Sequence, residues 1–109
     1  MRVAGMGFQS TATPQTLRTA LASVEAVDRV ATAAPKAAAL AQALGRDVES
    51  AEVAGISTPT MSQASLAAHG TGSVAEAAAL VVAGRNARLL NTRKIIGGVT
   101  IAVAEGDGR

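Results

Sequence analysis

The sequence has 109 residues, of which 49% are hydrophobic, and it carries ten Lys and Arg against eight Asp and Glu. This length fits one domain, and a formal charge of +2 with a single aromatic residue provides neither the basic surface nor the stacking groups of a nucleic-acid-binding protein. The chain has no cysteine for disulfides, thiolate chemistry or a metal site and no apolar run long enough for a membrane span, so we expect a cytoplasmic protein with no membrane contact.

The hydrophobic pattern predicts strands that alternate with helices along the chain. In chain order the expected elements are a buried strand at 2–6, a helix from 14 to about 27, an extended piece at 28–33, a helix at 35–44, a strand or a turn at 47–50, a short helix at 59–69, a helix at 74–83, and a hairpin with strands at about 87–96 and 99–104. We expect one domain over residues 2–104 and a frayed tail at 105–109.

Residues typical of helix ends support these boundaries. A threonine followed by a proline at 13–14 indicates a cap and a first helical residue, and Ser57 or Thr58 is expected to cap the short helix in the same way. Ser73 and Glu76 are three residues apart, the spacing of a capping box in which each side chain bonds the other residue's backbone N–H. Alternation of strands and helices before a terminal hairpin predicts an α/β fold with a mixed sheet.

The first glycine turn, "GMGFQS" at residues 5–10, does not fit a dinucleotide-binding motif. Ser10 stands where the third glycine of that motif belongs, and the helix is expected to begin about six residues after Gly7 rather than within the glycine run. Two interpretations remain. Gly5 and Gly7 either let a ligand approach the backbone, with Gln9 and Ser10 as hydrogen-bonding groups, or simply permit a tight bend.

The second glycine turn lies in "HGTGSVAEAAAL", directly before a helix N-terminus, where backbone N–H groups favour an anion. No lysine follows Gly72, so a phosphate-binding P-loop is excluded. The alternative is structural, because Ser73 and Glu76 would satisfy each other as a cap without any ligand. The single histidine, His69, has no paired carboxylate nearby and is more typical of a surface residue than of a ligand or base.

Two groups of cations are candidates for acidic ligands. Lys36 lies near a helix start, where a positive charge disfavours the helix. Residues 85–94 hold three arginines and a lysine with no acid between them. Such a run is usually a solvated face, but beside the glycine turns it would suit a ligand with several carboxylates.

Four segments together, "VAGMGFQSTAT", "VATAAPKAAALAQALG", "GTGSVAEAAAL" and "VTIAVA", resemble in that order the CobE family, which is similar to the C-terminal domain of CbiG in cobalamin biosynthesis. The resemblance covers about residues 2–104, and its most specific part is "GTGSVAEAAAL". It implies a three-layer α/β/α domain and a role in making the corrin macrocycle, whose intermediates carry many carboxylates.

The resemblance also implies site residues. The matching positions are Gly5 and Gly7 in the first turn, Lys36 after the second strand, Pro59 with Ser62, the run from Gly72 to Glu76, and Thr100 in the last strand. The family commonly has a basic residue where Gln9 stands, and an acid soon after the lysine where this chain has only "AAALA". The predicted ligand-binding set is therefore Gly5, Gly7, Gln9, Ser10, Lys36, Ser62, Gly72, Ser73 and Glu76.

The favoured function is binding or transfer of a precorrin or corrin intermediate, with no cofactor, no metal and no nucleic-acid partner. One alternative is an enzyme acting on such an intermediate, as whole CbiG-type proteins open a lactone, with Lys36, His69 or Glu76 as acid or base. Another is a module that assembles with a pathway methyltransferase and binds no ligand. The sequence shows no nucleophile–base pair, which weighs against an autonomous hydrolase.

Overall fold

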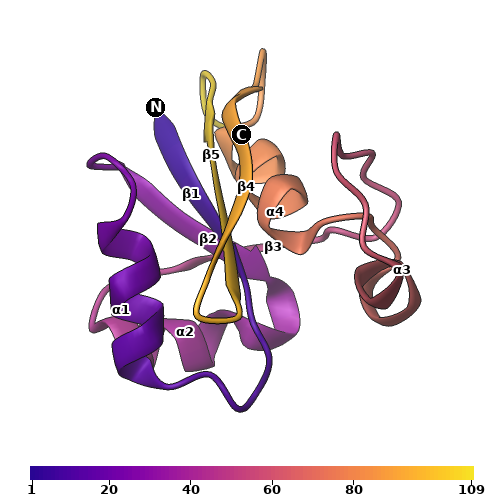
Figure 1. Cartoon of the computed structure of the whole chain (residues 1–109). Helices are drawn as coiled ribbons and strands as arrows, with labels where there is room; N and C mark the ends of the chain where they lie inside the picture. Colours follow the sequence, from indigo (N-terminus) through magenta and orange to yellow (C-terminus); the bar gives the residue numbers. More distant parts are fainter.

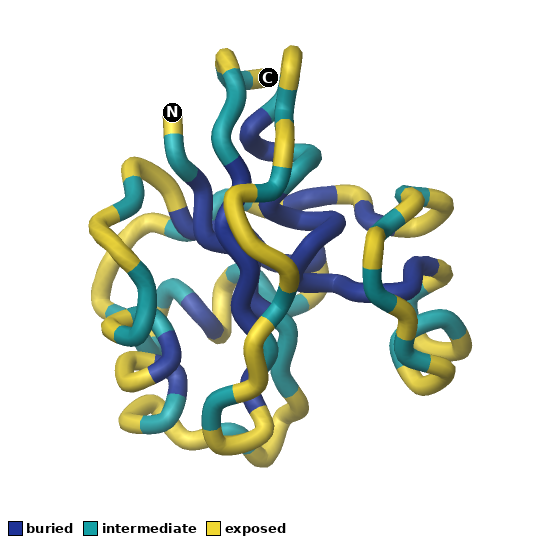
Figure 2. Tube along the Cα trace, turned by 45° about the horizontal axis from the view of Figure 1, so that its top comes forward, coloured by how far each residue is buried: buried dark blue, intermediate teal, exposed yellow.

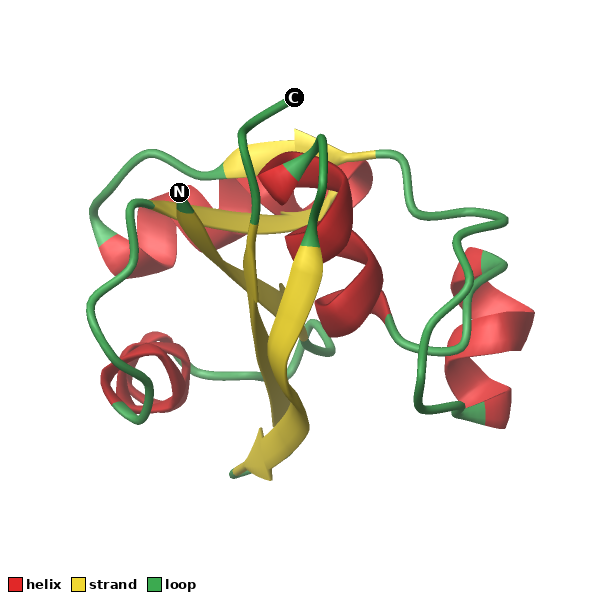
Figure 3. Cartoon of the chain, turned by 90° about the horizontal axis from the view of Figure 1, so that it is seen from above, coloured by secondary structure: helices red, strands yellow, loops and turns green.

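A five-stranded mixed sheet forms the middle of the computed structural model, which describes residues 1–109 (Figures 1 and 3). The elements are β1 (Arg2–Gly7), α1 (Pro14–Ala22), β2 (Arg29–Ala33), a 3₁₀ turn η1 (Ala34–Lys36), α2 (Ala37–Leu44), β3 (Glu49–Ala51), α3 (Gln63–His69), α4 (Val74–Ala83), β4 (Arg88–Ile96) and β5 (Val99–Glu105). The strand order is β3-β2-β1-β5-β4, with β1, β2 and β3 parallel and β5 antiparallel to both neighbours. The predicted α/β class with a mixed sheet and a terminal hairpin is confirmed.

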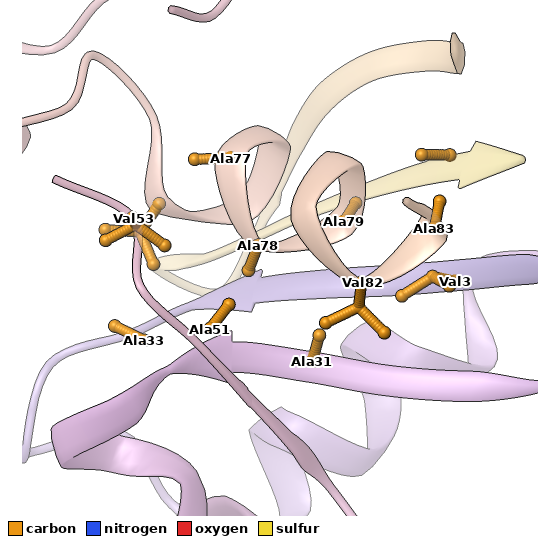
Figure 4. Close-up of a cluster of buried hydrophobic side chains, with 12 residues drawn as sticks. Val3, Ala31, Ala33, Ala51, Val53, Ala77, Ala78, Ala79, Val82 and Ala83 are labelled. Carbon is orange, nitrogen blue, oxygen red and sulfur yellow. The ribbon is translucent and has the colours of Figure 1, made fainter. Parts of the chain in front are cut away.

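Helices cover both faces of the sheet, which gives the expected three layers. Because side chains alternate along a strand, Val3 of β1 points to one face and Ala4 to the other. α4 packs on the first face through alanines and valines (Figure 4). α1 and α2 cover the second face, where Leu17 and Leu40 meet the sheet. Figure 2 shows the buried residues concentrated along the central strands and the adjoining helix, with exposed residues at the periphery.

The first glycine turn begins with a glycine that packs against α4. A Cβ at Gly5 would lie 1.9 Å from the backbone oxygen of Ala75 and 2.6 Å from the nitrogen of Ala79. No side chain fits there, since real Cβ atoms do not approach a backbone atom so closely. Gly5 and the small residues of α4 therefore let the helix lie directly on β1.

Three helices are shorter than predicted. α2 begins at Ala37 rather than at Pro35, because residues 34–36 form the 3₁₀ turn η1. α1 ends at Ala22 rather than near residue 27, because the Ser23 hydroxyl donates to the Ala20 oxygen at 2.6 Å and the Lys94 ammonium donates to the Ser23 oxygen at 3.0 Å. These bonds satisfy carbonyls that another helical turn would otherwise use. The Thr13 cap before Pro14 is confirmed.

The short helix begins four residues later than predicted. Ser62, not Ser57 or Thr58, caps α3, because the Thr58 hydroxyl instead donates to the Thr60 oxygen at 2.8 Å and holds a loop at 57–61. Gly70, at φ +70°, ends α3 as expected.

Residues 49–51 and the last residues of the chain also have defined structure. Residues 49–51 form the short strand β3 rather than a turn. In the final residues, where the sequence predicts fraying, the Gly108 N–H donates to the Ala83 oxygen at 2.7 Å, and the Gly106 N–H donates to the Met1 oxygen at 3.0 Å. The chain ends therefore lie near each other (Figure 1).

Membrane-spanning helices are not evident. No single helix is long and apolar enough to cross a bilayer; α3 and α4 taken together, with a bend of 59° between them, meet the criteria of length and composition only.

Candidate functional site

One cleft of about 490 Å³ opens where the first glycine turn, the N-terminus of α4, the β4–β5 hairpin and α3 come together. Its lining comprises Gly7, Phe8, Gln9, Ser10, Lys36, Ser62, Ala64, Ser65, Ala68, His69, Ser73, Val74, Arg93, Gly98 and Thr100. The cleft lies at the carboxyl end of the parallel strand β1, which is the usual place for a ligand in an α/β sheet.

The two glycine turns of the sequence are neighbours in this cleft. A Cβ at Gly7 would lie 3.5 Å from the Cβ of Val74 and 3.6 Å from the nitrogen of Ala75, at the start of α4. The Thr100 hydroxyl of β5 donates to the Gly7 oxygen at 3.1 Å and holds the end of β1 against the hairpin. Groups far apart in the sequence thus form one continuous wall.

The cleft is cationic. Lys36, His69 and Arg93 line it, and none of the 15 lining residues is acidic. The Lys36 ammonium donates to the backbone oxygen of Phe8 and lies 5.0 Å from the centre of the Phe8 ring. Lys36 is therefore held across the first turn, with its charge at the cleft, by a hydrogen bond and a cation–π contact.

Five hydroxyl groups add hydrogen-bonding capacity to these charges. They belong to Ser10, Ser62, Ser65, Ser73 and Thr100. The Ser62 and Ser73 oxygens accept the capping N–H groups of α3 and α4, at 3.4 and 3.3 Å. The Ser65 oxygen is buried and has no hydrogen-bond partner within the protein, so it has unused donor and acceptor capacity at the cleft.

Six of the nine predicted site residues lie in the cleft and three do not. Those that line it are Gly7, Gln9, Ser10, Lys36, Ser62 and Ser73. Gly5 is buried beneath α4, and Gly72 is buried where a Cβ would lie 2.8 Å from the Thr60 oxygen and from the Thr58 hydroxyl. Both glycines permit close packing of backbone segments and do not face the cleft.

Glu76 also lies outside the cleft, and the predicted capping box is only half formed. The Glu76 N–H donates to the Ser73 hydroxyl at 3.3 Å, as expected. The Glu76 carboxylate does not return to Ser73; it accepts hydrogen bonds from Thr60 and from the backbone of Arg93. The spacing of Ser73 and Glu76 correctly predicted the cap. The second bond of the capping box is missing because the Glu76 carboxylate bonds Thr60 and Arg93 instead.

Several lining residues were absent from the predicted set. Arg93 belonged to the basic run, and its place at the cleft depends on an irregularity of β4 that no local pattern shows. His69 is in the last turn of α3, as a surface residue would be, but it also lines the cleft. Ser65 is one helical turn from each of Ser62 and His69, so a serine–histidine stripe at helical spacing was the signal available.

The structure has no metal-binding cluster, because no three His, Asp or Glu side chains lie close enough together to hold one ion. The site instead combines fixed cations, hydroxyl groups and a few apolar surfaces, among them Phe8 and Val74. This combination suits recognition of a large molecule with both carboxylates and apolar parts.

Comparison with known proteins points to one family. The sequence matches the family described as "Cobalamin synthesis G C-terminus" over residues 2–104. Among solved structures, CobE, a protein from the cobalamin biosynthetic pathway, has a TM-score of 0.74 and 24% identity, over 100% of this chain and 92% of that one. The cobalamin biosynthesis protein chiG from Agrobacterium tumefaciens strain C58 has a TM-score of 0.70 and 31% identity, over 98% of this chain and 99% of that one. No curated protein sequence matches the chain.

Proposed function

Because the chain belongs to the cobalamin synthesis G C-terminus family, and so to the cobalamin biosynthesis pathway, we propose that its cleft binds a precorrin or corrin intermediate that carries several carboxylates and hands it on. The observation that carries this proposal is the charge of the cleft, with three basic side chains and no acid. We place this activity in the cytoplasm as part of the same proposal.

Charge and geometry support a polycarboxylate ligand. Lys36 and Arg93 come from separate elements, so they present positive charges from two parts of the cleft rather than as one patch, and His69 adds ring nitrogens from a third element. A ligand with acidic groups around its rim would meet them at several points, and each charge-assisted hydrogen bond is stronger than a neutral one. The serine and threonine hydroxyls would bond the remaining carboxylate oxygens.

The apolar surfaces suit the same class of ligand, and the cleft is large enough to hold part of it. The volume of about 490 Å³ lies within the range typical of small-molecule sites, so a corrin polyacid would enter the cleft in part, with the rest of the macrocycle outside. Phe8 and Val74, with Ala64 and Ala68 of α3, offer apolar contact to a flat ring. The macrocycle would then pack against these groups while its side chains reach the cations.

The first test is an anaerobic absorbance titration with hydrogenobyrinic acid, a corrin polyacid. Wild type is expected to give a saturating spectral shift. Lys36→Ala is expected to raise Kd by about tenfold, the loss of one charge-assisted contact. Arg46→Ala is the control, since it removes one positive charge from an exposed position outside the cleft and is expected to change Kd less than about twofold.

The outcomes separate the functional alternatives. Arg93→Ala keeps the backbone N–H and removes only the side chain, so a loss of affinity like that of Lys36→Ala would support the cleft as the site. A flat wild-type titration would overturn ligand binding and favour the partner module. The enzyme alternative is tested with a precorrin that carries a lactone, where a spectrum that keeps changing at substoichiometric protein would indicate turnover.

A further inference from the structure

Glu76 is a buried acid whose carboxylate joins two distant segments of the chain. Its side chain is 0% exposed. One carboxylate oxygen accepts from the Thr60 N–H at 3.1 Å and from the Thr60 hydroxyl at 2.6 Å, and the other accepts from the Arg93 N–H at 3.0 Å. No Lys or Arg side chain pairs with it. Burial of a carboxylate is unfavourable unless hydrogen-bond donors compensate for its lost hydration. These three bonds therefore hold the Glu76 carboxylate in place.

The first segment is residues 57–72, called here the α3 arm. It projects from the body of the molecule, and no residue of α3 is fully buried (Figures 1 and 3). Within the arm, the Ser62 N–H donates to the Gly72 oxygen at 2.8 Å. The base of the arm is bonded to the preceding loop, where the Gly70 oxygen accepts from the Gly55 N–H and the Thr71 hydroxyl donates to the Ile56 oxygen. Thr60 makes the only hydrogen bonds from the arm to a helix or strand of the body, and both go to Glu76.

The second segment is a bulge in β4. Asn91 pairs with Val103 and Lys94 with Ile101, so residues 92 and 93 of β4 face Ala102 alone. A bulge leaves a backbone group outside the regular ladder. Here the Arg93 N–H donates to Glu76, and the Arg93 side chain lines the cleft.

We infer that Glu76 is a positioning residue that sets the separation between two walls of the cleft. One wall is the α3 arm with Ser62, Ser65 and His69, and the other is the bulge with Arg93. The same carboxylate holds both, so its two oxygens fix where these groups stand relative to each other. The consequence for ligand affinity rests on the proposed function; the geometric coupling of arm and bulge does not.

The variant Thr60→Val tests this inference without altering the cleft lining, because Thr60 is not a lining residue. It removes one of the bonds to Glu76 and keeps the shape of the side chain. Hydrogenobyrinic acid is expected to bind about tenfold more weakly, since a hydrogen bond to a charged group is lost. Thr60→Ser restores the hydroxyl and is expected to restore affinity. Thr19→Val makes the same chemical change on exposed α1, where the hydroxyl donates to the Gln15 oxygen, and is expected to leave affinity unchanged.

A second measurement needs no ligand. In Thr60→Val, amide hydrogen exchange by NMR is expected to be at least about tenfold faster than in wild type at position 60 and also faster at position 93, whose N–H bonds the same carboxylate, with β1 and β2 unchanged. Glu76→Gln keeps one acceptor oxygen and replaces the other with an NH2 donor, so exchange is expected to accelerate at whichever of the Thr60 and Arg93 amides then faces the NH2 group.

These results distinguish the inference from the proposed function. If wild type binds and Thr60→Val binds equally well, the positioning role is overturned and the proposed function stands. If wild type does not bind, the proposed function fails and exchange alone decides. Faster exchange at both positions 60 and 93 in Thr60→Val then supports the coupling, and a change confined to position 60, or no change, overturns it.

Discussion

α3 and α4 follow each other in the chain and are both rich in alanine, but their environments are opposite. Eight of the ten residues of α4 are buried, whereas α3 has none. α4 lies on β1, β2 and β5, and α3 projects away from the sheet (Figure 1). The cleft lies between them, with Ser73 and Val74 from α4 on one side and Ser62, Ser65 and His69 from α3 on the other.

The difference shows how a small domain can combine a fixed wall with an adjustable one. Burial of apolar side chains against the sheet supplies most of the stability of α4, which therefore reports global unfolding. α3 lacks this burial, so its stability comes from its caps and from a few bonds of the arm to the body, among them those of Thr60 to Glu76 and of Gly55 to Gly70, and it is expected to open locally. Substitutions at α4 are therefore expected to change global stability more than substitutions at α3.

The largest effect is expected at the contact of α4 with β1. Gly5→Ala would place a Cβ 1.9 Å from the Ala75 oxygen, so the helix must move away from the sheet. Overpacking of this kind is expected to lower the free energy of unfolding by about 3 kcal/mol or more, measured by urea denaturation.

Gly45→Ala is the control for that substitution. Gly45 has a φ of +67° and no atom within 4 Å of the added Cβ, so only the backbone conformation opposes the change. A loss of about 1 kcal/mol is expected. Equal losses at Gly5 and Gly45 would show that α4 does not depend on close approach to β1.

The two cap serines provide a matched pair of intermediate effect. Ser73→Ala removes the cap of α4 and is expected to lower the global free energy of unfolding by about 1 kcal/mol. Ser62→Ala removes the cap of α3 and is expected to change the global value by less than about 0.5 kcal/mol while amide exchange in α3 becomes faster. A common effect on global unfolding would mean that α3 and α4 unfold as one unit.

A small effect of opposite sign is expected at Ser65, where one substitution separates stability from binding. The Ser65 oxygen is buried without a partner, so Ser65→Ala is expected to raise the free energy of local opening of α3 by about 0.5 kcal/mol, measured as slower amide exchange in α3. The same change is expected to weaken hydrogenobyrinic acid binding about threefold if the ligand uses this hydroxyl. Destabilisation on loss of the hydroxyl would contradict the assignment of Ser65 as an unused group.

Local signals in the sequence predicted most of the fold. Helix ends were marked by Thr13 before Pro14 and by the glycines at 45, 70 and 84. Capping and a positive φ at glycine depend on only a few adjacent residues, so local patterns reveal them. The end of α1 was misplaced because it depends on a bond from the distant residue Lys94 to Ser23. The start of α3 was misplaced because the Thr58 hydroxyl bonds the Thr60 oxygen within the loop instead of capping a helix.

The candidate site was predictable only where its residues lie in glycine turns or resemble the family motifs. The cleft residues that were predicted in this way include Gly7, Ser10, Lys36 and Ser73. Arg93 did not stand out from the basic run, because its position depends on pairing between β4 and β5. Glu76 was assigned to the ligand because a capping pattern does not reveal that a carboxylate turns toward two other segments.

The bulge in β4 also bears on self-association. β4 is an edge strand with exposed Leu90 and Ile95, and a straight edge of this kind is a template for strands of other molecules. Two shifts of register, between 89 and 91 and between 91 and 94, interrupt its ladder, and Lys94 adds a charge. The irregularity that delivers the Arg93 N–H to Glu76 therefore also protects the open edge of the sheet against aggregation.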